Sequence, residues 1–158
     1  MKTKQAFALF AITVLFASMT ATTMCAANQA RPTDSAILES YEKIQLSLAS
    51  DSLKGVTENA EAISKAVKDD PDKRTDADLK QHADKLANDK DLKTAREDFK
   101  NLSAGLIAYL EKSNFAKVGY EQNYCPMVNA SWLQKGKKVN NPYFGKEMPG
   151  CGTPKKSF

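Results

Sequence analysis

The spacing of apolar side chains between residues 32 and 114 constrains the fold more than any other feature of this sequence. Four segments carry apolar residues at every third or fourth position: residues 32–50, 51–70, 75–90 and 91–114. In the first segment these residues are Ile37, Tyr41, Ile44 and Leu48. Such spacing places the apolar side chains on one face of a helix and leaves the charged side chains on the other faces.

These segments predict a helical bundle. The second segment ends before Pro71, which lacks the N–H that a helix interior requires. Three or four amphipathic helices joined by short loops must bury their apolar faces against one another. The sequence therefore predicts an all-α fold, a three- to four-helix up-down bundle. The Lys- and Asp-rich faces are interpreted as solvated surface.

Residues 115–158 have a different composition and form an irregular, Cys/Met-rich tail. They contain five glycines and four prolines, which favour turns. Residues 117–127 alternate in polarity and reach Pro126, which predicts a short strand entering a turn and leaves room for a short β-hairpin. A tail of this composition buries little apolar surface alone. Packing on the bundle, a disulfide or a metal has to hold it.

The N-terminus has the pattern of a secretory signal peptide over residues 1–27. Lys2 and Lys4 precede an apolar run at residues 6–17, and small residues follow up to a predicted cleavage after Ala27. The run is shorter than the ~20 apolar residues that span a bilayer, and no later segment is apolar enough to do so. We therefore predict a periplasmic or secreted protein with no membrane span.

A lipoprotein is the alternative interpretation, with Cys25 as the lipidated residue, although residues 22–24 depart from the usual Leu-Ala-Gly type of lead-in.

Removing residues 1–27 takes away two lysines and no acidic residue, so the net charge falls from +4 to +2. Residues 28–158 are the length of a single domain. The mixed charges give no basis for nucleic-acid binding.

Four sulfur atoms in two short stretches carry the chemistry of the tail. Cys125 and Met127 flank a proline, and Met148 and Cys151 flank Pro-Gly. Thiolate and thioether are soft donors suited to Cu(I), and turns lower the entropy cost of aiming them at one point. We predict a soft-metal site with these four ligands, with His82, the only histidine, as a secondary candidate.

A disulfide is the alternative for the two cysteines. Two cysteines 26 residues apart in an exported chain commonly pair. Closing that loop would contribute roughly 3–4 kcal/mol in the chain-entropy model. The two methionines would then be packing residues. Trp132 would cap the ion in a metal site, whereas in a disulfide-linked tail it would be a core residue. The two interpretations are compatible, since a reduced pair can bind metal and an oxidised pair can lock the tail.

The tail resembles a bacterial family through four short motifs. These are Tyr-Cys-Pro-Met at 124–127, Trp-Leu at 132–133, Asn-Asn-Pro-Tyr-Phe-Gly at 140–145 and Met-x-x-Cys-Gly at 148–152. The family is a periplasmic domain of unknown function, found alone or fused to adaptor subunits of heavy-metal, copper-type efflux pumps. The resemblance implies a helical bundle, a Cys/Met tail and metal handling. Residues 128–131 are shorter and more polar here than in such members.

Catalysis has little support, because no nucleophile elbow, His-Glu-x-x-His or phosphate-binding glycine loop occurs. Two functions of different class follow. The first is a non-enzymatic module that binds or transfers Cu(I), with a heavy-metal efflux adaptor or another envelope protein as partner. The second is a structural or protein-interaction domain closed by a Cys125–Cys151 disulfide.

Overall fold

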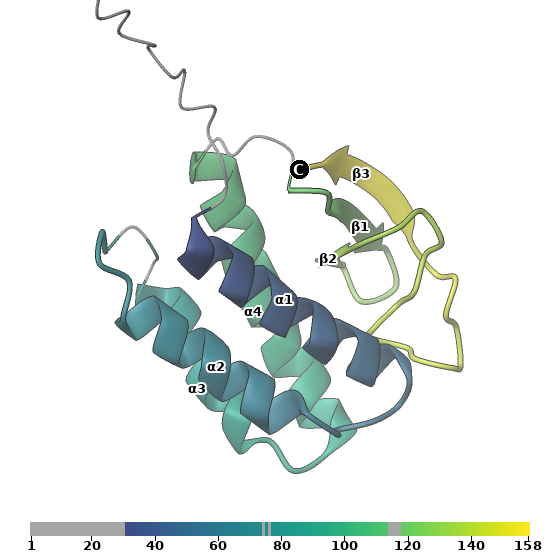
Figure 1. Ribbon diagram of the computed structural model, residues 1–158. Helices are drawn as coiled ribbons and strands as arrows, with labels where there is room; N and C mark the ends of the chain where they lie inside the picture. Colours follow the sequence, from purple (N-terminus) through teal and green to yellow (C-terminus); the bar gives the residue numbers. More distant parts are fainter. Residues whose placement is uncertain (1–30, 74, 76, 114–117) are drawn as a thin grey trace, which may run out of the picture.

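The computed structural model describes residues 31–73, 75, 77–113 and 118–158. The predicted signal peptide and Cys25 lie outside these residues. The described chain begins with four helices, α1 (Pro32–Ala49), α2 (Val56–Lys68), α3 (Ala77–Asn88) and α4 (Leu92–Ser113) (Figure 1). The helices fall within the four segments that the apolar spacing predicted.

The apolar faces of the helices form the core, as expected. In α1 the side chains of Ile37, Tyr41, Ile44 and Leu48 are all at most 1% exposed. Gly55 explains why α2 begins several residues later than its apolar pattern: its φ of +78° lies in the left-handed region, where glycine is favoured.

Consecutive helices pack side by side, α1 on α2, α2 on α3 and α3 on α4. Short connections join them, which is the arrangement predicted for the bundle. Figure 1 shows α2 and α3 on the side of the bundle away from the strands. Among the described residues, no helix is long and apolar enough to cross a membrane.

A three-stranded sheet corrects the prediction of an all-α fold. It contains β1 (Glu121–Cys125), β2 (Ala130–Gln134) and β3 (Thr153–Ser157), in the order β2-β1-β3. Both pairings are antiparallel. The β1–β2 pair is the hairpin that the sequence allowed, and the extra strand comes from the C-terminal end of the chain.

The third strand escaped prediction because it carries no apolar alternation. Every residue of β3 is exposed, so hydrogen bonds to β1 hold it rather than burial. Phe158 completes the attachment, since its N–H donates to the carbonyl of Tyr120 and its carbonyl accepts the N–H of Gly119. Backbone pairing of this kind leaves no periodic signature in the side chains.

The sheet packs on α1 and α4 around Tyr41. The Tyr41 ring stacks on Phe99, with the centroids 4.9 Å apart. Its hydroxyl lies 2.7 Å from Ser103 Oγ and accepts the N–H of Leu133 at 3.1 Å. Trp132 is fully buried in β2. These contacts join strand β2 to both helices and make Trp132 a core residue.

Candidate functional site

Cys125 and Cys151 meet at one end of the sheet. Cys125 is the last residue of β1, and Cys151 lies two residues before β3. Their Sγ atoms are 3.4 Å apart, and both cysteines are free. A disulfide would place the sulfurs about 2.05 Å apart. The structure therefore brings the two thiols into direct contact without a bond between them.

Asn141 fixes the backbone around the two thiols. Its side-chain amide donates to the carbonyl of Cys151, and its own N–H donates to the carbonyl of Pro149. Its side-chain oxygen accepts the N–H groups of Tyr143 and Phe144. An asparagine before a proline commonly initiates such turns. The Asn-Pro pair is visible in the sequence, but the contacts of Asn141 with residues around Cys151 arise only in the folded chain.

Gly152 allows the turn at Cys151 to lie directly on the Trp132 ring. A Cβ on Gly152 would come within 2.5 Å of Trp132 Cη2 and 3.2 Å of Val139 Cγ1. Trp132 itself is held by a hydrogen bond from Nε1 to Gln134 Oε1 at 3.0 Å. The turn that carries Cys151 therefore packs directly against the Trp132 ring.

The loop that contains Asn141 is anchored to the helices by Arg96 of α4. Arg96 donates to the carbonyls of Pro142 at 2.9 Å and Leu48 at 3.0 Å, and pairs with Asp51 at 2.6 Å. Gly145 has a φ of +55°, and a Cβ there would overlap the Asp51 carboxylate. The sulfur site is thus supported by a loop tied to the bundle.

The environment makes the two thiols unequal. Burial raises the pKa of Cys125, but hydrogen bonds from the Val128 N–H, Cys151, Asn141 and the Met127 N–H outweigh it and hold that pKa below its usual value. Its partner shows the opposite shift: the hydrogen bond to Cys125, followed by burial, raises the pKa of Cys151. The two thiols therefore lose their protons as a coupled pair, and after the first loss the remaining proton is shared between the two sulfurs.

The two methionines lie on the turns next to the cysteines. Met127 is 65% exposed, in the turn between β1 and β2. Met148 is partly buried, and its carbonyl accepts the N–H of Cys151. In the described part of the chain, no group of three or more His, Cys, Asp or Glu side chains could hold a metal. A third side-chain donor for a soft ion at the thiols would therefore be a thioether.

His82 lies elsewhere. It is on α3, which packs on α2 and α4, and it lines a surface pocket together with Gly105 and Tyr109. Its Nδ1 is buried without a hydrogen-bond partner among the described residues. The structure does not bring His82 to the thiols, so it would have to bind an ion separately.

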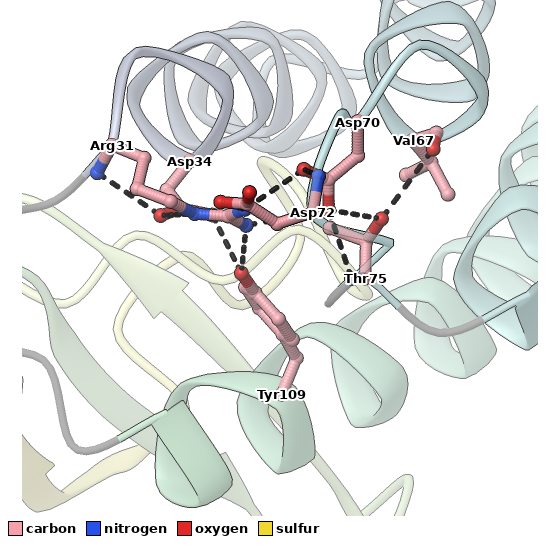
Figure 2. Close-up of polar contacts among 7 residues, drawn as sticks. All are labelled: Arg31, Asp34, Val67, Asp70, Asp72, Thr75 and Tyr109. Carbon is pink, nitrogen blue, oxygen red and sulfur yellow. Dashed lines mark hydrogen bonds and ion pairs between the residues drawn. The ribbon is translucent and has the colours of Figure 1, made fainter.

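A second polar cluster, which the sequence did not predict, surrounds Arg31 at the start of α1. Figure 2 shows its side chain among those of Asp34, Asp70, Asp72 and Tyr109. The guanidinium nitrogens lie 2.9 Å from Asp34, 2.8 Å from Asp70 and 3.1 Å from Asp72. The Tyr109 hydroxyl accepts from Arg31 at 2.7 Å and donates to Asp34 at 2.6 Å. The cluster joins α1, the α2–α3 loop and α4, and is best explained as structural.

The helical part of the chain matches a known protein family. Residues 37–117, about half of the sequence, match the model of a family described as "Protein of unknown function (DUF3347)", and the chain belongs to that family. The match begins within α1, includes α2 to α4 and ends before the two cysteines. No curated protein and no solved structure matches the chain.

Proposed function

We propose that this DUF3347 protein is an exported, non-enzymatic module that binds Cu(I) through Cys125 and Cys151, assisted by the thioethers of Met127 and Met148. The observation that carries the proposal is the contact between two unbridged thiols, 3.4 Å apart, each beside a turn that carries a methionine. Soft sulfur donors of these two kinds select Cu(I) over hard cations.

The separation of the two sulfurs fits an ion after a small adjustment. Two sulfurs each about 2.3 Å from one ion, at a tetrahedral angle, lie ~3.8 Å apart, a length borrowed from zinc–thiolate bonds. The thiols in contact would open by a few tenths of an ångström. Cys151 is partly exposed and follows two exposed residues, Pro149 and Gly150, so its side chain has room to rotate by this amount while the backbone keeps its position.

The unequal exposure of the donors supports transfer rather than storage. Cys125 is fully buried, whereas Met127 is 65% exposed and Cys151 is partly exposed. An ion held from beneath by Cys125 would remain reachable by the sulfur ligands of a docking protein. We propose an envelope protein, such as a heavy-metal efflux adaptor, as that partner. His82 is left out of the ligand set because it lies on α3.

A second candidate function rests on the same contact. Closing the 3.4 Å gap to a disulfide needs about 1.4 Å of movement, so the pair could instead form a covalent link. The chain would then be a structural or protein-interaction domain, with the C-terminal strand locked to the sheet. The redox state of the thiols in the exported protein separates the two candidates.

A competition titration tests the proposal. Reduced full-length chain carrying Cys25→Ser, which removes the third thiol, is titrated against a Cu(I) chelator. We expect one Cu(I) per chain, and a large loss of competition in Cys125→Ser and in Cys151→Ser. His82→Gln is the matched control and should compete like the parent. Equal competition by the parent and both serine variants would exclude the thiols from the site.

A further inference from the structure

The two thiols in contact differ sharply in their access to solvent. Cys125 is 0% exposed, as the last residue of the central strand. Cys151 is partly exposed and follows Pro149 and Gly150, which are both exposed. A reagent in solution therefore approaches the pair from the side of Cys151.

We propose that the metal-free, reduced chain undergoes thiol–disulfide exchange in a fixed order, with Cys151 as the attacking thiol and Cys125 as the resolving thiol. The co-reactant is an external disulfide, either of a small thiol or of a thiol-oxidising protein. The proposal uses the thiols of the proposed function but does not depend on metal binding.

The first step forms a mixed disulfide. When the proton shared by the two sulfurs lies on Cys125 Sγ, the thiolate of Cys151 attacks one sulfur of the external disulfide R–S–S–R, so that a bond forms between Cys151 Sγ and that sulfur while the S–S bond of the reagent breaks. One R–S⁻ leaves. Attack in line with the S–S bond requires an open approach, which the surface turn at Cys151 provides and the buried end of β1 does not.

The second step closes the internal disulfide. Cys125, now deprotonated, attacks Cys151 Sγ and expels the second R–S⁻, and the proton of the thiol passes to solvent or to the leaving thiolate. The reacting sulfurs start 3.4 Å apart, so the attack needs only a small movement. In total the chain loses two electrons and two protons, and R–S–S–R is reduced to two R–SH.

Formation of the internal disulfide has a direct consequence for metal binding. The internal disulfide consumes both thiolates, so the oxidised chain cannot hold Cu(I) through them. An ion bound at Cys151 would in turn block the attacking sulfur. Oxidation and metal binding therefore exclude each other at this site.

The reaction with 5,5′-dithiobis(2-nitrobenzoic acid) tests the order, using reduced, metal-free, full-length chain with Cys25→Ser. We expect this parent to release two chromophores per chain and keep no adduct. Cys125→Ser should release one at a similar initial rate and keep an adduct on Cys151. Cys151→Ser should react at least about tenfold more slowly, because its remaining thiol is buried.

Two results would overturn the proposal: Cys151→Ser reacting as fast as Cys125→Ser, or a parent chain that keeps two adducts. Circular dichroism of each variant shows whether it is folded, and Cys125→Ala replaces Cys125→Ser if the hydroxyl is not tolerated in the buried position. Because no metal is present, failure of the Cu(I) titration leaves this outcome unaffected, and the reverse also holds.

Discussion

The side-chain amide of Asn141 donates a hydrogen bond to the backbone carbonyl of Cys151, ten residues further along the chain. This bond joins the turn at Pro142 to the turn that carries the second thiol. Since Asn141 is 0% exposed, each polar atom of its side chain needs an internal partner. The position of Cys151 against Cys125 thus depends on a residue that carries no sulfur.

Replacing Asn141 with alanine should loosen the sulfur site. The change leaves the carbonyl of Cys151 and the N–H groups of Tyr143 and Phe144 without partners, so we expect a loss of about 2 kcal/mol in the free energy of unfolding. Urea unfolding measures it. Asn140→Ala is the matched control, since Asn140 is engaged through its backbone N–H and carbonyl. Equal losses in both variants would contradict the role of Asn141.

Substitution of Gly152 by alanine should displace the second turn from the sheet. The added Cβ would lie 2.5 Å from Trp132 Cη2, so the indole or the turn must shift, at a cost of about 1–3 kcal/mol. Trp132 is the only tryptophan, so its fluorescence reports the shift directly. Gly150→Ala meets nothing within 4 Å and should leave stability and fluorescence unchanged.

The helical half of this chain could be predicted from its sequence because burial and spacing agree there. Each apolar residue that defined the first segment, from Ile37 to Leu48, is buried, and Pro71 follows the end of α2. The strand β3 could not be predicted, because it is held mainly by backbone hydrogen bonds to β1 and its side chains are exposed. The ion pair between Arg31 and Asp70 could not be predicted from the sequence either, since ion pairs between distant residues leave no periodic pattern.

The candidate site was predictable in its residues but not in its geometry. The turn residues around Cys125 and Cys151 indicated that the two stretches could converge, and the structure places those thiols in contact. The supporting contacts of Asn141 and Arg96 depend on the tertiary fold. Metal binding by the four sulfurs stays a prediction, and His82 lies apart from them.

Replacing Met148 with leucine should weaken Cu(I) binding while leaving thermal stability nearly unchanged. The swap removes the thioether but conserves volume, which usually costs less than about 1.5 kcal/mol in a packed position. Met127→Leu tests the exposed donor, where even this cost should vanish because the side chain is 65% exposed. Chelator competition and thermal unfolding are measured on the same samples. A large loss of stability in Met148→Leu, with unchanged Cu(I) affinity, would assign Met148 to the core.

Acid should weaken the fold through the carboxylates around Arg31. Burial opposes ionisation of Asp34 and Asp70, but hydrogen bonds from Arg31 and other groups outweigh it, lowering the pKa of Asp34 and bringing that of Asp70 from 3.8 to about 2. A carboxyl with a lowered folded-state pKa binds fewer protons when folded than when unfolded. Its stabilisation is therefore complete above about pH 5 and is lost as the pH falls from about 4 towards 2.

Substituting glutamine for Arg31 should lower the stability at pH 7 and reduce this pH dependence. At pH 7 two buried carboxylates lose their cation, so we expect a loss of about 3 kcal/mol in the free energy of unfolding. Without the Arg31 guanidinium, Tyr109 still donates to Asp34 and Thr75 still donates to Asp70, so both pKa values should rise and the loss of stability on acidification should become smaller. Urea unfolding at a series of pH values between 2 and 7 measures this. Lys65→Gln, which breaks an exposed ion pair with Asp69, should keep the parent profile, and an Arg31→Gln profile parallel to the parent would contradict the role given to the cluster.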